Sequence, residues 1–171
     1  MQKIFKLFLI AALSAILTAC GFHLRGEQAL PPQLKTLYID AAPYAPLTLA
    51  LKKSLRSADV NIVSAVAQSP LTLQILNENF EQNISNISAS TLVKTYTLIY
   101  SVEVQLLNKS GKVIYGPQTV KTYSSYAVSD NQILGDNSQL KTQQANMRRD
   151  LIGLIFNRLG SDNVRKALAS N

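Results

Sequence analysis

The 171-residue sequence is short of the side chains that most often carry out chemistry: it has one cysteine, one histidine and no tryptophan. Because Cys20 is the only cysteine, no disulfide can form within the chain, and a folded domain has to be stabilised by its core. Cys20 and His23 together fall short of the three or four protein ligands of a zinc site. Acidic residues are scarce, 10 against 17 basic ones. This balance favours anionic surfaces or ligands, although solvated surface charge would give it too, and no nucleic-acid-binding motif is present.

The N-terminal residues 1–19 lack the length of a membrane span. Their apolar run, Leu7 to Leu17, broken only by Ser14, is shorter than the ~20 residues that a spanning helix needs. Lys3 and Lys6 supply positive charge before this run, and small residues follow it. This order is typical of a secretory signal peptide. We therefore expect residues 1–19 to be removed on export, in preference to forming a buried N-terminal helix or a retained membrane span.

The tetrapeptide Leu17–Cys20 resembles the bacterial lipobox, in which a peptidase cuts in front of an acylated cysteine. A thiolate is a suitable atom to modify because it is nucleophilic. The resemblance implies S-diacylglycerol and an N-acyl chain on Cys20, and several chains together anchor a protein stably. In such lipoproteins an Asp directly after the cysteine retains the protein in the inner membrane. This chain has Gly21 there, which is compatible with sorting to the outer membrane. Cys20 is then no free thiol, and we interpret His23 as a packing or hydrogen-bonding residue beside the anchor.

Alternation with period two is the clearest structural signal in the rest of the chain. From Tyr96 to Leu106 every second residue is apolar, and those between are mostly polar, with Ile99 the exception. This pattern predicts a half-buried antiparallel strand with one face on a core. Asn108–Gly111 predicts a tight turn into another strand, and Gly116-Pro117 indicates a bulge or an edge position in it.

Helical periodicity predicts two long helices. The first follows Pro46, whose missing N–H is not needed in a first turn, and Gly160 is a natural stop for the second. The composition of the Asn-rich stretch 77–90 is compatible with the outer half of a long strand, with a mobile tip, or with both. The first predicted strand covers residues 34–39, the second begins at 71 and the third covers 95–106. The fourth covers 112–115 and, after the interruption at Gly116-Pro117, 118–128. The predicted helices cover 47–58 and 140–159.

The predicted fold is therefore α+β, a two-layer sandwich of order β-α-β-β-β-α, with two helices on one face of a four-stranded, mostly antiparallel sheet. We expect one domain over 20–171, with a lipidated tether at 20–33 and a short tail at 161–171, in which Ser161-Asp162 caps a short helix. The opposite face of the sheet should be polar and open, unlike the concave pocket of a catalyst. Its expected residues are Thr95, Thr97, Ser101, Glu103 and Gln105.

Three segments resemble the LptE family of lipopolysaccharide-assembly lipoproteins. Residues 20–26 look like the mature start of these proteins, 94–118 like their central hairpin, and 122–161 like their last strand, loop and long helix. The resemblance implies a non-catalytic lipoprotein on the periplasmic face of the outer membrane, without cofactors other than its covalent lipid. It would plug the lumen of the LptD β-barrel, help to assemble it, bind lipopolysaccharide and take part in its delivery to the outer leaflet.

Charged residues common in the family are missing from this chain. Gly135-Asp136 stands where an Ala-Lys pair is frequent, Gln143-Gln144 where Glu-Glu is frequent, and residues 85–92 contain no cation. On chemical grounds we expect substitutes for the missing cations to bind the phosphates of lipopolysaccharide. The same substitutes would also serve as solubilising residues at a sheet edge or turn. They are Lys94, Lys109 and Lys112.

Two other classes of function compete with this prediction. A free envelope lipoprotein with a scaffolding or peptidoglycan-binding role needs no barrel partner. A hydrolase needs a Ser/His/acid set, paired carboxylates or metal ligands. His23 beside the anchor and ten scattered acidic residues provide little for such a site.

Overall fold

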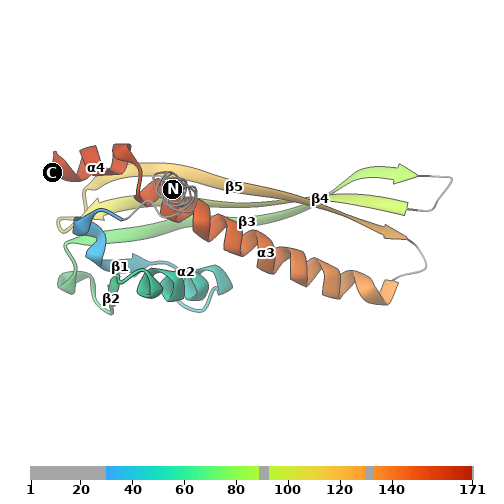
Figure 1. The fold of residues 1–171 in the computed structure, drawn as a ribbon, viewed down its shortest axis with the longest axis horizontal. Helices are drawn as coiled ribbons and strands as arrows, with labels where there is room; N and C mark the ends of the chain where they lie inside the picture. Colours follow the sequence, from blue (N-terminus) through green and yellow to red (C-terminus); the bar gives the residue numbers. More distant parts are fainter. Residues whose placement is uncertain (1–29, 89–92, 130–132, 171) are drawn as a thin grey trace, which may run out of the picture.

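The computed structural model of the chain describes residues 30–88, 93–129 and 133–170. Long strands run side by side along the molecule, and the long helix α3 lies obliquely against them (Figure 1). The elements are a 3-10 helix Pro32–Lys35, β1 Thr36–Asp40, α2 Pro46–Ser57, β2 Asn61–Val63, a 3-10 helix Val66–Gln68, β3 Leu71–Ser88, β4 Val93–Asn108, β5 Val113–Ser129, α3 Ile133–Leu159 and α4 Asp162–Ala169.

The sheet has five strands in the order β2-β1-β3-β4-β5. β1 pairs in parallel with both β2 and β3, whereas β3, β4 and β5 are antiparallel. The predicted number of four strands is therefore wrong: the sheet has five and is mixed, with antiparallel pairing along its three long strands. β2 is only three residues long, too short to show alternation. It is parallel to β1 because the helix α2 connects them, and such a crossover returns the chain in the same direction.

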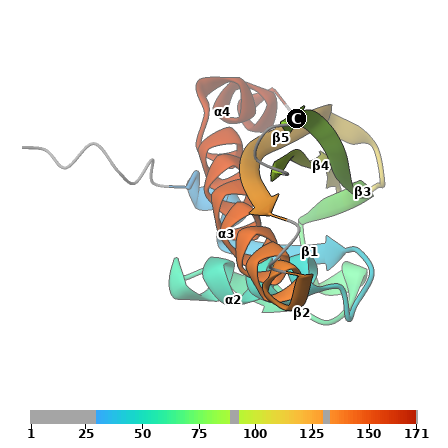
Figure 2. The same ribbon diagram turned by 90° about the vertical axis from the view of Figure 1, so that its right-hand side faces the viewer.

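Helices lie on one side of the sheet, as predicted (Figure 2). α2 agrees with the predicted 47–58 within one residue at each end. α3 starts at Ile133, well before the predicted residue 140. The sequence 133–139 repeats no apolar residue at helical spacing, so periodicity gives no signal for these first turns. A third helix, α4, confirms the short helix after Gly160, but the Ser161 hydroxyl does not cap it: Ser161 Oγ donates to the Arg158 carbonyl oxygen at 2.7 Å.

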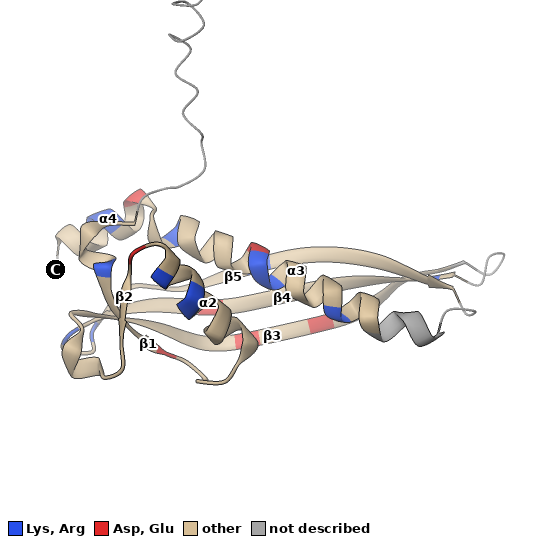
Figure 3. Ribbon diagram, turned by 60° about the horizontal axis from the view of Figure 1, so that its bottom comes forward, with Lys and Arg blue, Asp and Glu red and all other residues tan. Residues whose placement is uncertain are grey.

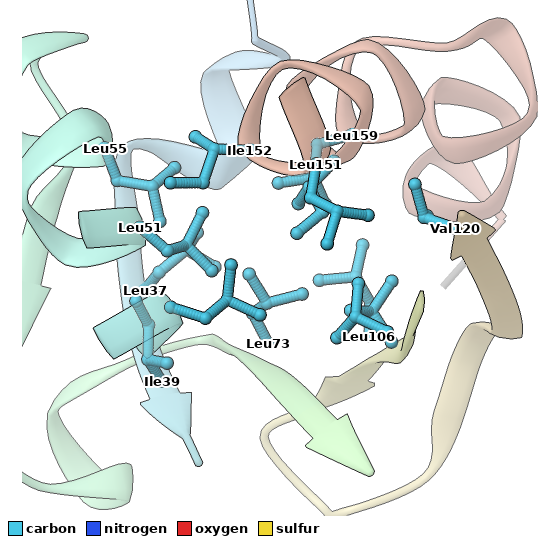
Figure 4. Close-up of a cluster of buried hydrophobic side chains, with 14 of the residues drawn as sticks. Leu37, Ile39, Leu51, Leu55, Leu73, Leu106, Val120, Leu151, Ile152 and Leu159 are labelled. Carbon is cyan, nitrogen blue, oxygen red and sulfur yellow. The ribbon is translucent and has the colours of Figure 1, made fainter. Parts of the chain in front are cut away.

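The core lies between α2, α3 and the helix-facing side of the sheet. Figure 4 shows side chains from both helices and from β1, β3 and β4 meeting in one cluster. Leu51, Leu73, Leu151 and Ile155 have no exposed surface. Burying one such side chain contributes about 1.5–3 kcal/mol. Of the residues that helical periodicity places on the apolar stripe of α3, Met147, Leu151, Ile155 and Leu159 are buried, whereas Leu154 is 38% exposed.

The alternation in β4 is confirmed from Leu98 to Leu106, whereas Tyr96 is half-buried like its neighbours. All even positions from Leu98 to Leu106 are buried, and all odd positions from Thr95 to Gln105 are partly exposed. β3 runs on to Ser88, so the Asn-rich stretch is the outer half of a long strand through that residue; 89 and 90 lie outside the described residues. β3 pairs with β4 throughout, with register shifts at Ile75/Asn77 and Ile84/Asn86.

β5 is an edge strand and also has a bulge, so both predictions made from Gly116-Pro117 are confirmed. The register with β4 shifts between Val104 and Leu106. Gly116 adopts a φ of 97°, and a Cβ there would lie 2.8 Å from the Val104 carbonyl oxygen. Only glycine combines this φ with so close a backbone approach. In the described part of the chain, no helix has the length and apolar character needed to cross a membrane.

These contacts predict opposite effects of two glycine substitutions. Gly116→Ala should lower the free energy of unfolding by more than ~1 kcal/mol, because it adds a clash and an unfavourable φ. A Cβ added at Gly153, in α3, would meet no other atom within 4 Å, so Gly153→Ala should raise the free energy of unfolding by about 0.5–1 kcal/mol through helix propensity. Urea unfolding of both variants measures the difference. A loss of the same size in both would contradict the bulge geometry.

Candidate functional site

The sheet face that points away from the helices carries a hydrogen-bonded row of polar side chains. Gln74 Nε2 donates to Asp40 Oδ2 at 2.7 Å, and Gln105 Nε2 donates to Gln74 Oε1 at 2.6 Å. This row crosses three strands, β1, β3 and β4. Further along β3, Asn79 Nδ2 donates to Glu81 Oε1 at 2.7 Å. The predicted polar face is therefore present and can hydrogen-bond to a polar partner.

On the helix-facing side, a polar cluster ties α3 to β3 and β4. The Tyr100 hydroxyl donates to the Glu78 carboxylate. Arg148 from α3 hydrogen-bonds to the same Tyr100 hydroxyl. Burial raises the pKa of Tyr100 to about 12; the hydrogen bond to Glu78 acts in the same direction and Arg148 opposes it. Arg148 Nε is buried and has no hydrogen-bond partner within the described residues.

The outer part of the same face is aromatic and polar rather than aliphatic. Tyr96 and Tyr126 stack with ring centroids 5.3 Å apart. Gln82 Nε2 donates to the Tyr126 hydroxyl at 2.9 Å, which links β3 to β5 across β4. Ser124 Oγ donates to Gln143 Oε1 at 3.1 Å. Gln143, a residue of the Gln143-Gln144 pair that departs from the family pattern, thus contacts the sheet.

The three lysines predicted from the sequence do not form one site. Lys109 and Lys112 lie together at the β4–β5 turn, where Asn108 Oδ1 accepts the backbone N–H of Lys112 at 3.0 Å. Lys94 lies near the other end of β4, in register with Val128. At ~3.3 Å per strand residue, Lys94 and Lys109 are about 50 Å apart. Cys20, His23 and most of the loop after β5 lie outside the described residues.

Charge is divided between the two layers (Figure 3). The described side chains of α2 and α3 include one carboxylate, Asp150, and the strands β1, β3 and β4 include one cation, Lys94. Sequence reasoning missed the helix cations as a group. Helical periodicity places Arg148 and Arg149 off the apolar stripe of α3. It cannot show that α2 lies next to them, because that depends on how the two helices pack. The cations of the helix layer are Lys52, Lys53, Arg56, Lys141, Arg148, Arg149 and Arg158; the carboxylates of the strands are Asp40, Glu78, Glu81 and Glu103.

The fold and these surfaces have known relatives. The family model LptE, described as "Lipopolysaccharide-assembly", matches residues 34–159. The chain belongs to the LptE family. The match runs from the start of β1 through the end of α3, so the LptE pattern covers the sheet and both long helices. The resemblance seen in the sequence is confirmed.

Two curated LptE proteins illustrate the relationship. LPS-assembly lipoprotein LptE of Pectobacterium atrosepticum is 30% identical over 169 residues, which cover 95% of this chain and 91% of the relative. LPS-assembly lipoprotein LptE of Yersinia enterocolitica is 35% identical over 104 residues, 59% of this chain and 50% of the relative. The relatives are lipoproteins of the lipopolysaccharide-assembly system, and the chain shares their family.

Solved structures show the same fold at lower identity. The solution structure of uncharacterized lipoprotein B from Nitrosomonas europaea matches with a TM-score of 0.68 at 22% identity, covering 82% of this chain and 90% of that one. Rare lipoprotein B from Shewanella oneidensis matches with a TM-score of 0.65 at 21% identity, covering 76% and 97%. The LptE fold described above is thus shared with other bacterial lipoproteins.

The raised pKa of Tyr100 predicts a loss of stability at alkaline pH. A tyrosine in the unfolded chain titrates near pH 10, so below that pH both states keep the proton. Between about pH 10 and about pH 12 the unfolded chain loses the proton while folded Tyr100 keeps it, and the free energy of unfolding falls as the pH rises. Tyr100→Phe should remove this component.

Urea unfolding as a function of pH measures the effect. Tyr123→Phe is the matched control, since Tyr123 is 65% exposed and that variant keeps Tyr100. Identical pH dependence of stability in the native chain and in Tyr100→Phe would contradict the predicted role of the buried cluster.

Proposed function

We propose that the chain is a non-catalytic outer-membrane lipoprotein that plugs the lumen of an LptD β-barrel, helps to assemble that barrel, binds lipopolysaccharide and takes part in its delivery to the outer leaflet. The observation that carries this proposal is the LptE family match over residues 34–159. The name borne by its relatives, LPS-assembly lipoprotein, supports the lipopolysaccharide part of it.

The polar sheet face supports the role of a plug. The interior of a large outer-membrane barrel is polar, and a protein inside it has to offer hydrogen-bonding groups rather than an apolar patch. The row Asp40–Gln74–Gln105 offers carboxylate and amide groups across three adjacent strands. The elongated shape of the sheet also suits a lumen that is longer than it is wide (Figure 1).

The N-terminal segment completes the proposal. Residues 1–19 would be removed as a signal peptide, Cys20 would carry the S-diacylglycerol and N-acyl chains, and 20–33 would tether the fold to the periplasmic face of the outer membrane. Several acyl chains are needed for stable anchoring. Lys94 at one end of β4, and Lys109 with Lys112 at the other, would then be two separate contacts for anionic groups of the ligand.

Cys20→Ala tests the anchor. The variant should accumulate as an unprocessed precursor outside the outer membrane, because no thiolate is available for acylation. Membrane fractionation and the mass of the mature N-terminus measure this, with His23→Ala as a control that keeps the cysteine. Normal maturation of Cys20→Ala would exclude lipidation at this residue.

The barrel partnership predicts a stoichiometric complex and a defined interface. A tagged chain should co-purify with one large outer-membrane β-barrel protein. A photo-crosslinking residue at Thr97 or Gln105, on the polar sheet face, should crosslink to the barrel more efficiently than one at Lys53, an exposed position on α2. Crosslinking followed by immunoblotting separates the two faces.

The alternative is a free envelope lipoprotein with a scaffolding or peptidoglycan-binding role. It predicts purification without a barrel and retention on isolated peptidoglycan. Absence of any barrel protein from the purified material would favour this alternative over the plug.

A further inference from the structure

A hollow lies between α2 and α3, away from the lysines considered above. It has a volume of about 550 Å³. Small side chains leave room for it, since Ala50 on α2 and Ala145 on α3 both line it. The other lining residues, all on α3, are Lys141, Thr142, Asn146, Arg148 and Arg149.

The lining is cationic. Lys141, Arg148 and Arg149 contribute three positive charges, and no Asp or Glu belongs to this lining in the described part of the chain. Asp150 follows Arg149 in α3 but does not line the hollow. Lys and Arg at this density attract an anion, and the guanidinium groups suit the oxygens of a phosphate.

Two of these cations are held in place by neighbouring groups. Arg148, which lines the hollow, hydrogen-bonds to Tyr100 on β4. Arg149 Nη2 donates to Asn146 Oδ1, another lining residue. A cation that is already ordered loses less conformational entropy when it binds a ligand. Arg148 and Arg149 are therefore ordered before a ligand arrives.

The spacing of the outer cations indicates more than one anionic group. Lys141 and Arg149 are eight residues apart on α3, about 12 Å at the ~1.5 Å rise per residue of a helix. That separation exceeds the size of a single phosphate. It suits two phosphates carried at opposite ends of a disaccharide, as in the diphosphorylated glycolipid part of lipopolysaccharide.

We propose that the α2–α3 hollow binds the phosphorylated disaccharide of lipopolysaccharide, with Lys141 and Arg149 contacting its phosphates. The inference rests on the proposed function for the identity of the ligand. It adds a contact in the helix layer to those proposed at the two ends of β4. The polar sheet face stays free for the barrel.

The experiment compares double variants of the purified chain for binding to phosphatidylcholine vesicles that contain diphosphoryl lipid A. Lys141→Gln with Arg149→Gln should weaken binding about tenfold or more, because two charge-assisted contacts are lost. Both side chains are exposed, so thermal unfolding should change little. Lys121→Gln with Lys166→Gln removes the same charge from β5 and α4 and should leave the affinity within about twofold.

Further arms identify the groups that are recognised. Monophosphoryl lipid A should bind more weakly than the diphosphoryl form to the native chain, and the Lys141/Arg149 double variant should lose that preference. Lys141→Arg with Arg149→Lys, which keeps both charges, should retain most of the affinity. Pyrophosphate in solution should compete only at concentrations far above those of the lipid.

Four outcomes would overturn the inference: equal weakening by the hollow and the Lys121/Lys166 variants, weakening only by Lys109→Gln with Lys112→Gln, no weakening by any of them, or pyrophosphate competing as well as the lipid. If the native chain fails to bind diphosphoryl lipid A, the lipopolysaccharide-binding part of the proposed function fails with the inference. Co-purification with the barrel is judged separately.

Discussion

The structure depends on the need to cover one face of β4. This strand is paired on both sides, so only its two faces can meet anything else, and five alternate side chains from Leu98 to Leu106 require removal from water. Met147, Leu151 and Ile155 of α3 provide that cover, and α2 extends it over β1 and β3. Once these stripes are buried, the remaining sides of both helices must face outward. The cationic helix surface and the polar sheet face are thus two consequences of one packing constraint.

The three long strands continue past α2, β1 and β2, and the chemistry of the helix-facing side changes where this cover ends (Figure 1). Aliphatic side chains give way to stacked Tyr96 and Tyr126 and to the Tyr100–Glu78 pair. Tyrosine suits such a position because its ring packs while its hydroxyl hydrogen-bonds. Arg148 then joins this semi-exposed part of the sheet to the helix layer, beside the hollow.

What could be predicted from the sequence follows the same physics. β4, α2 and the bulge at Gly116 were predictable because alternation, a helical stripe and Gly-Pro each report a local constraint. β2 could not be predicted, because three residues are too few to show alternation. Its position beside β1 also depends on the crossover through α2. The first turns of α3 were missed because their sequence, 133–139, repeats no apolar residue at helical spacing. Lys94, Lys109 and Lys112 were chosen by residue type alone. The length of β4 then places Lys94 and Lys109 at opposite ends of the sheet, which residue type does not show.

The division of charge would let the lipid and the barrel proposed above contact different layers of one small protein. Asp40, Glu81 and Glu103 of the strands lie on the other side of the core from the cations of α2 and α3. Glu78 is the exception among the described strand carboxylates, because it faces the helices and pairs with Tyr100 near Arg148. An anionic lipid is repelled from the strand layer and attracted to the helix layer, whereas an uncharged polar wall can pair with the amides of the strands. Mixing the two sets of charges on one face would weaken both kinds of contact. A two-layer fold keeps the two sets of charges apart, because the helices form one layer and the sheet the other. The apolar face of β4 holds the two layers together, since it has to be covered by the helices.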